Sequence, residues 1–177
     1  MRAAERLGTC VLAAALLAAC AEESGHLDEP LAAESDVAEA PAAPSVELLS
    51  GERRALAEFR GSWLFVNYWA EWCAPCLEEI PELNALHAED GVYVLGINFD
   101  QLDAGTMRPQ VAALGIRFPV AAVDPTELLG LELPEVLPST FVFDPSGETV
   151  AVLRGPQTLD ALHGAMTSMH AAPGASD

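Results

Sequence analysis

The stretch WAEWCAPCLEEIP, residues 69–81, contains the two cysteines that decide how this sequence is interpreted. Cys73 and Cys76 are separated by two residues, with Pro75 between them and Trp72 directly before them. A pair with this spacing can bind a metal ion, form a structural disulfide or act as a reactive dithiol. The flanking segments, together with the other cysteines and histidines of the chain, distinguish these possibilities.

The segments that flank the pair predict a strand followed by a helix. The run WLFVNYW, residues 63–69, is almost entirely apolar and aromatic, which is typical of a buried central strand. Between residues 74 and 89 leucine and isoleucine recur at threes, which predicts a helix, and Pro81 within it predicts a kink. Cys73 is therefore expected at the N-terminus of this helix.

That position has a chemical consequence for Cys73. The free backbone N–H groups and the positive end of the helix dipole favour a thiolate, which is the nucleophilic form of cysteine. Cys76 follows one turn later and deeper, where it can attack a mixed disulfide and release the product. Pro75 restrains the loop between the two cysteines and removes an amide donor.

The alternatives to a dithiol are less well supported by the sequence. A zinc site requires four ligands at characteristic spacing, and a copper-delivery site favours a wider cysteine spacing with histidine or methionine nearby. A structural disulfide across so short a loop adds little stability. No metal and no cofactor is expected, because none of the histidines has ligand spacing to the pair: His26, His87, His163 and His170.

The sequence of the remainder of the domain predicts strands that alternate with helices. This order favours an α/β fold with a sheet covered on both faces. A tight turn at residues 145–147 indicates that the last two strands form a hairpin. The expected strands are residues 92–99, 118–123, 139–144 and 148–153, and the further helices are residues 106–115, 125–131 and 158–170.

The N-terminus has the pattern of an export signal. The apolar run from Leu7 to Ala19 is too short to span a bilayer and has the length of a signal-peptide core. The tetrad Leu-Ala-Ala-Cys that ends at Cys20 resembles a bacterial lipobox, which implies removal of residues 1–19 and lipidation of Cys20. The alternative is an ordinary signal peptide with an Ala-x-Ala cleavage site. The alanine after Cys20 favours the outer membrane, and the choice between inner and outer membrane stays open.

Composition supports an exported, tethered domain. Residues 20–45 are rich in alanine, acidic residues and proline, which predicts a disordered tether that begins at Cys20 and spans on the order of 25–30 Å. The folded domain is expected over residues 46–170, followed by a frayed tail at 171–177. The net charge of −19 and the absence of lysine argue against nucleic-acid binding. After removal of the signal and lipidation of Cys20, the pair 73–76 contains the only free cysteines.

Two motifs resemble a known family. FVNYWAEWCAPC followed by VLPSTFVFDPSG resembles the thioredoxin superfamily, and WCAPCLEEIPEL resembles its TlpA/ResA-type membrane-tethered thiol–disulfide reductases. The resemblance covers about residues 46–170. It implies an α/β thioredoxin-like fold with a central mixed sheet of four or five strands, helices on both faces, and an inserted helix–strand element around residues 104–123. It also implies that Cys73 and Cys76 form the redox disulfide.

The resemblance further assigns roles to residues around the pair. Leu137-Pro138 matches the cis-proline that faces the disulfide and holds a substrate peptide, although a plain proline before a strand is the alternative. Trp72 matches the tryptophan that shields the reactive cysteine, and Pro75 completes the expected substrate-binding set. Glu79 matches the glutamate that moves protons for the thiols, although a solvated helix glutamate is the alternative.

One difference from ordinary thioredoxin gives Glu79 more weight. Thioredoxin has a buried aspartate in the strand, six residues before the first cysteine, and this chain has Asn67 there. Asparagine cannot accept the proton that the resolving cysteine must lose. If a base is needed, Glu79 is the nearest candidate on the helix.

These observations predict a lipid-anchored thiol–disulfide oxidoreductase of the bacterial cell envelope. The expected substrates are disulfides of exported proteins, with apocytochrome c during cytochrome c maturation as one class that the resemblance suggests. The expected partners also include a membrane thiol electron donor and the lipid bilayer, which Cys20 would reach. Open alternatives are an envelope oxidase or isomerase, a non-catalytic binding module and a peroxidase. Glu71 and Glu78 near the pair would raise the thiol pKa, which favours a reductant.

Overall fold

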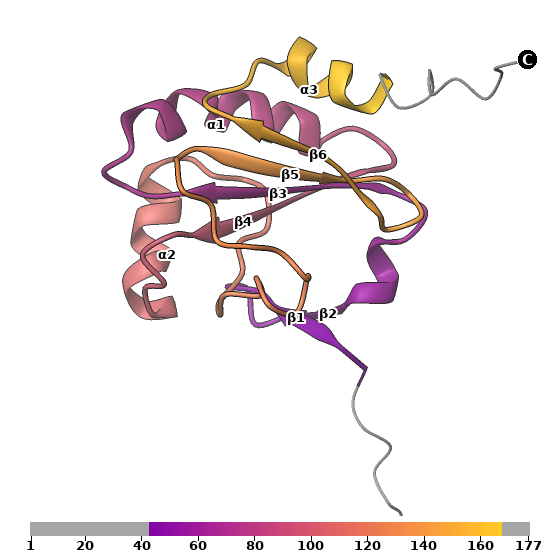
Figure 1. Cartoon of the computed structure of the whole chain (residues 1–177). Coiled ribbons are helices and arrows are strands. Elements are labelled where there is room, and N and C mark those ends of the chain that lie inside the picture. The colour runs from indigo at the N-terminus through magenta and orange to yellow at the C-terminus, as the bar shows by residue number, and fades with distance from the viewer. Residues whose placement is uncertain (1–42, 168–177) are drawn as a thin grey trace, which may run out of the picture. The chain divides into compact units, whose positions relative to one another are not determined.

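The computed structural model describes residues 43–167 (Figure 1). The predicted signal peptide, Cys20, the predicted tether up to residue 42, the last three residues of the helix expected at 158–170 and the tail at 171–177 lie outside the described residues. Within residues 43–167, no helix has both the length and the apolar character that a membrane crossing requires.

The centre of the domain is a mixed sheet of four strands. The central strand β3 is parallel to β4 and antiparallel to β5, and β6 pairs with β5 as the predicted hairpin. The strand order across the sheet is β4-β3-β5-β6. The bounds of the strands are β3 Trp63–Trp69, β4 Val92–Asn98, β5 Ser139–Phe143 and β6 Thr149–Arg154.

Helices α1, Ala74–His87, and α3, Leu159–Thr167, contact each other, and both lie along one side of the sheet (Figure 1). Helix α1 contains Pro81 and continues past it to His87. The inward residues of β3 and of both helices form one apolar cluster, in which Phe65, Leu83 and Leu162 are fully buried. Packing these apolar side chains of β3 against the two helices removes them from water, which explains why the apolar run 63–69 forms the central strand.

The opposite face of the sheet is covered by a small hairpin and a 3-10 helix. Strands β1, Ser45–Glu47, and β2, Arg53–Ala55, lead into η1, Leu56–Phe59, and Phe59 packs into a second buried cluster. Helical elements therefore flank both faces, and the predicted α/β fold with a mixed sheet is confirmed. The hairpin and η1 themselves were not predicted, because their charged sequence shows little apolar alternation.

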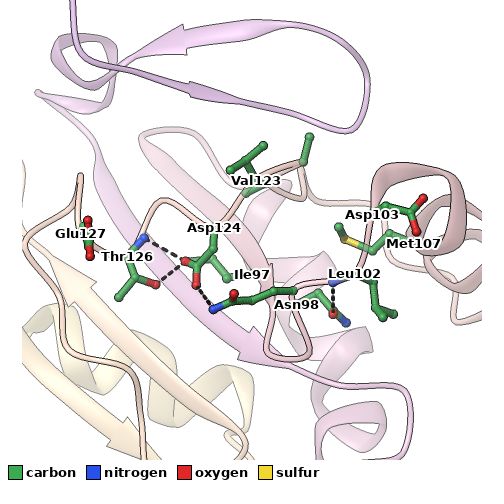
Figure 2. A pocket seen from close by; sticks show the side chains of 12 residues that line it. Ile97, Asn98, Leu102, Asp103, Met107, Val123, Asp124, Thr126 and Glu127 are labelled. Atoms are coloured by element: carbon green, nitrogen blue, oxygen red, sulfur yellow. Dashed lines mark hydrogen bonds between the residues drawn. The ribbon is translucent and has the colours of Figure 1, made fainter.

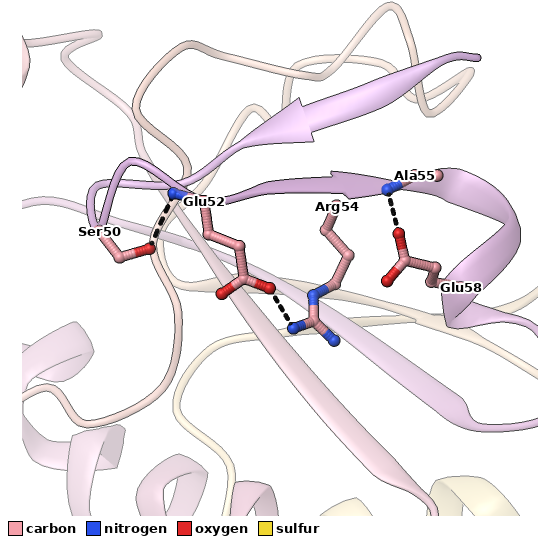
Figure 3. Close-up of polar contacts among 5 residues, drawn as sticks. All are labelled: Ser50, Glu52, Arg54, Ala55 and Glu58. Atoms are coloured by element: carbon pink, nitrogen blue, oxygen red, sulfur yellow. Dashed lines mark hydrogen bonds and ion pairs between the residues drawn. The ribbon is translucent and has the colours of Figure 1, made fainter.

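Local polar contacts shape this hairpin (Figure 3). The backbone N–H of Glu52 donates to Ser50 Oγ at 3.3 Å, and the side chain of Glu52 pairs with Arg54. Glu58 Oε1 accepts from the backbone N–H of Ala55 at 2.8 Å and so caps the start of η1. These contacts are at least partly exposed, so they contribute little to stability and mainly set the path of the backbone through the hairpin.

Helix α2, Ala104–Ala113, forms the inserted element beyond the β4 edge (Figure 1). Asp103 caps its start by accepting from the N–H groups of Gly105 and Thr106, and Gly115 follows its end with φ of 66°. The predictions of a strand at residues 118–123 and of a helix at residues 125–131 were both wrong. Residues 118–123 make only isolated bridges. Residues 125–131 form turns, in which Leu129 N donates to Pro125 O at 2.9 Å, Gly130 N to Glu127 O at 3.0 Å and Leu131 N to Thr126 O at 2.9 Å.

The bridge at Gly96 explains why residues 118–123 do not form a strand. Gly96 donates to Pro119 O at 2.8 Å and accepts from Ala121 N at 2.9 Å, and the chain then turns to meet Leu48 of the β1–β2 hairpin. The segment therefore crosses β4 at one residue and does not run along it. A Cβ at position 96 would lie 3.0 Å from the Phe118 ring, so any residue other than glycine would require that ring to shift.

The outer edge of β4 also receives a side chain. The N–H of Val94 donates to Nδ1 of His87 at 3.1 Å, and the N–H of Val92 donates to Glu89 O at 3.4 Å. Burial lowers the pKa of His87, with Arg54 adding to the effect, so the ring stays neutral and can accept this bond.

Gly96→Ala tests the crossing. The added methyl contacts Phe118, Trp69 and Val120, and such overpacking should lower the free energy of unfolding by about 1–3 kcal/mol. Gly164→Ala is the matched control: that glycine lies exposed in α3 with no atom within 4 Å of its added Cβ, and the change should stabilise by about 0.5–1 kcal/mol. Urea unfolding of the oxidised protein measures both. Equal effects of the two substitutions would contradict the crossing geometry.

Candidate active site

The cysteine pair lies where β3 leads into α1. Cys73 and Cys76 are joined by a disulfide, with their Cα atoms 5.3 Å apart. Cys73 is the N-cap of α1, and its carbonyl accepts from the N–H groups of Cys76 at 3.0 Å and Leu77 at 3.2 Å. Cys73 is 4% exposed and Cys76 is fully buried, so the order of depth agrees with the prediction. Pro75 lies in the first helical turn, where its missing N–H needs no partner.

Glu79 lies three residues after Cys76 on the same face of α1, and it is buried with 1% of its surface exposed. Asn67 Nδ2 donates to its Oε1 at 2.6 Å, and the backbone N–H of Gln157 donates to its Oε2 at 3.0 Å. Glu79 is therefore not a solvated helix glutamate, whereas Glu78 beside it is exposed.

Burial is the main cause that raises the pKa of Glu79, from 4.5 to about 7, and the two hydrogen bonds act in the opposite direction. The folded protein then holds this proton more tightly than the unfolded chain does. Stability from this group is therefore lost as the pH rises from about 4.5 to about 7, by about 3 kcal/mol in total. Near neutral pH the carboxyl group can be either charged or protonated, which suits a group that exchanges protons.

Asn67 connects Glu79 to the sheet. Its Nδ2 donates both to Glu79 and, at 3.0 Å, to Thr140 Oγ1 on β5. Both hydrogens of the amide are therefore used, and the position of the carboxyl group is set from β3 and β5 together. The amide replaces the aspartate of ordinary thioredoxin with a donor that orients Glu79.

The loop before Cys73 is held by the inserted element. Trp72 is 66% exposed, and its Nε1 donates to Asp100 Oδ2 at 2.9 Å and Oδ1 at 3.2 Å. Glu71 Oε2 accepts from Gln110 Nε2 of α2 at 2.7 Å. These bonds keep the tryptophan presented to solvent beside the reactive cysteine.

The Leu137–Pro138 peptide bond is cis, as the resemblance implies. In the antiparallel register of β3 and β5, Tyr68 pairs with Ser139, so Pro138 lies next to the end of β3 that leads to Cys73. Pro138 is buried, Leu137 is half-buried, and Val136 before them is 47% exposed. The predicted substrate-binding residues thus gather at the same end of the sheet as the dithiol.

Sequence reasoning missed the partners that position these residues. Gln157 is 78 positions away from Glu79, and Asp100 is 28 positions away from Trp72. A backbone N–H leaves no signal in a sequence, so no pattern could have identified Gln157. Among residues 43–167, no three or more His, Cys, Asp or Glu side chains are grouped so as to hold a metal ion.

Comparisons with known proteins agree with this arrangement. The model of the AhpC/TSA family matches residues 39–152. The thiol–disulfide oxidoreductase ResA of Bacillus thuringiensis (strain Al Hakam) is 32% identical over 119 residues, which are 66% of this chain and 68% of that protein. ResA of Bacillus subtilis (strain 168) is 27% identical over 137 residues, 75% of this chain and 76% of that protein.

A solved structure shows the same fold. The structure of a DsbF homologue from Corynebacterium diphtheriae superposes with a TM-score of 0.60 at 27% identity, over 70% of this chain and 82% of that one. The family match, the relatives and the cysteine pair together show that the chain belongs to the AhpC/TSA family of thioredoxin-like proteins, as a thiol–disulfide oxidoreductase of the ResA type.

Proposed function

We propose that this oxidoreductase works as a reductant of disulfides in exported proteins, with disulfide-bonded apocytochrome c as a substrate class. The observation that carries the proposal is the buried carboxyl group of Glu79, one helical turn from Cys76 and with a pKa of about 7. A group of this kind can take the proton that the resolving thiol must lose at neutral pH.

In the first step, the reduced protein carries a thiolate at Cys73. Its sulfur attacks one sulfur of the substrate disulfide, which forms a mixed disulfide and releases the other substrate sulfur as a thiolate that takes up a proton. The N-terminus of α1 favours the attacking charge, because Cys73 is the N-cap residue at the positive end of the helix dipole.

In the second step, Cys76 gives its proton to Glu79 and attacks the sulfur of Cys73. The Cys73–Cys76 bond forms, the mixed disulfide breaks, and the substrate leaves with both sulfurs reduced. Two electrons have then passed to the substrate, and a membrane thiol donor must return two electrons before the next cycle. The disulfide present in the structure is the form left after this step.

The substrate surface is formed by residues from two segments. Trp72 is exposed beside Cys73, and Leu137 and Pro138 lie across the end of β3, with Pro75 in the first turn of α1. An extended peptide can lie along Pro138 in strand-like register while the indole covers the reacting sulfurs. This places the substrate cysteine against the N-terminus of α1.

We propose that the enzyme is held in the cell envelope by lipid at Cys20. The apolar run and lipobox-like tetrad at residues 7–20 support this location, as does the acidic, proline-containing segment that follows. The net charge of −19 suits a basic substrate protein. The tether would let the domain reach substrates near the membrane without contact with the bilayer.

Trapping tests the direction of attack. Cys76→Ala should stall as a mixed disulfide through Cys73 when mixed with a disulfide-bonded peptide that carries the haem-attachment cysteines of apocytochrome c. Cys73→Ser should form none, because Cys76 is the buried partner. Intact-mass spectrometry measures both products.

Other outcomes identify the rival functions. If the oxidised protein converts the dithiol peptide to its disulfide faster than the reduced protein opens it, the enzyme is an oxidase. If the reduced protein consumes hydrogen peroxide faster than the peptide disulfide, it is a peroxidase. Normal cellular function of Cys73→Ser would favour a non-catalytic binding module.

The pH dependence of resolution tests Glu79. Resolution needs the charged carboxylate, so its rate should rise with pH through about 7 in the natural protein. In Glu79→Gln the thiol must ionise unaided, with an ordinary pKa of about 8.5, so resolution should slow about 10- to 30-fold at pH 7 and only about twofold at pH 9. Rapid-quench single turnovers measure the decay of the mixed disulfide.

Glu78→Gln is the matched control for this test. It removes the same charge from the same helix, one residue earlier, where the side chain is exposed. Its pH profile should equal that of the natural protein. If Glu79→Gln shows the same profile as well, the proposed proton transfer is wrong.

A further inference from the structure

A cavity of about 520 Å³ lies at the C-terminal end of β4, on the side of β3 away from Pro138 (Figure 2). It lies between the end of β4, the start of α2 and residues 121–127. Its apolar wall includes Ile97, Leu102 and Met107. This volume is within the range of ligand sites, and it can hold one or two amino-acid side chains.

Two adjacent residues link the cavity to the loop before Cys73. Trp72 is bonded to Asp100, and the next residue, Gln101, lines the cavity and donates from Nε2 to Asp124 Oδ2 at 3.0 Å. A polypeptide bound across Trp72 therefore reaches this cavity within a few residues of its own reacting cysteine. The proposed groove along Pro138 lies on the other side of β3.

The charged residues that line the cavity are all acidic. Asp103, Asp124 and Glu127 line it, no lining residue is cationic, and none of these three carboxylates forms an ion pair with a residue between 43 and 167. Hydrogen bonds, above all from the Thr106 hydroxyl, hold the pKa of Asp103 below its ordinary range, so it is charged at neutral pH. Figure 2 shows the three acidic side chains among those that line the cavity.

A second observation concerns Asn98, which is 3% exposed and lines the same cavity. Its Oδ1 accepts from Leu102 N at 3.4 Å, which orients the amide, and its Nδ2 has no partner among residues 43–167. A buried donor without an acceptor is costly, and a carbonyl oxygen brought by a ligand would satisfy it. A metal ion would not, and the described residues contain no metal-binding group of side chains.

We propose that this cavity is a specificity site that binds a lysine or arginine side chain of the substrate polypeptide, close in its sequence to the cysteine that is reduced. The cation meets Asp103, Asp124 and Glu127, its alkyl stem packs on the apolar wall, and a backbone carbonyl of the same segment supplies the acceptor for Asn98. The inference rests on the proposed reduction of protein disulfides and adds a substrate feature to it.

Paired peptides test the site. Each disulfide-bonded peptide carries either arginine or the neutral isostere citrulline, at one position within four residues of the cysteine. At the best position, the natural protein should reduce the arginine peptide about fivefold faster in kcat/KM, as expected for a partly exposed charge pair. In Asp103→Asn/Glu127→Gln the ratio should fall below about twofold. Asparagine remains a good helix cap, so α2 is retained.

The matched control is Asp90→Asn/Glu148→Gln. It removes the same two charges from exposed positions at the opposite end of the sheet, and it should keep the fivefold ratio. Glu127→Lys, at an exposed position whose backbone carbonyl accepts from Gly130 N but whose side chain accepts no hydrogen bond within residues 43–167, should make the arginine peptide the poorer substrate of the pair.

The outcomes separate the two proposals. A ratio near one at every position in the natural protein, or an equal fall in the control variant, would overturn the specificity site. Failure of the natural protein to reduce both members of every pair would instead overturn the proposed reductase function. Persistence of the fivefold ratio in Glu127→Lys would also contradict the site.

Discussion

The domain is organised around one buried carboxyl group. Glu79 of α1 receives a hydrogen bond from Asn67 on β3 and another from the backbone of Gln157, and Asn67 in turn donates to Thr140 on β5. Helix, sheet and the segment before α3 thus meet at a group that the interior would prefer to keep neutral. The same desolvation that destabilises the folded protein above neutral pH brings the pKa of this carboxyl group to about 7, where it can gain or lose a proton.

The sequence predicted those helices and strands in which buried residues recur regularly along the element. Residues 63–69 are apolar at almost every position because β3 is covered on both faces, and the assigned strand has these bounds. Residues 118–123 are equally apolar, but Phe118, Val120 and Ala121 are buried where the segment crosses β4 at Gly96, and not by pairing along it. Periodicity alone cannot separate the two cases. Residues 125–131 have proline and glycine where a helix begins and ends, but only Leu129 N to Pro125 O follows the helical bond pattern, and the next two N–H groups bond to Glu127 O and Thr126 O instead.

The site shows a similar division. The relative positions of Cys73, Cys76 and Glu79 could be predicted from their spacing, because residues three positions apart on a helix lie on the same face. The groups that orient Glu79 come from distant segments: the side-chain amide of Asn67 and the backbone N–H of Gln157, and a backbone N–H cannot be recognised in a sequence. The acidic cavity is a further case: Asp103 and Glu127 are separated in sequence by the whole inserted element, and they line one cavity because that element folds back on β4. Departures from a family pattern were more informative than matches, since Asn67 pointed to Glu79.

The outer border of β4 has a consequence for how copies of the domain behave together. Its N–H groups at Val92, Val94 and Gly96 are bonded to Glu89 O, to the neutral ring of His87 and to Pro119 O. An unpaired border strand is a template for adding a strand from a neighbouring molecule, which leads to aggregation. Here that template is occupied from within the chain. This occupancy disfavours the extension of the sheet from one copy of the protein to another through β4.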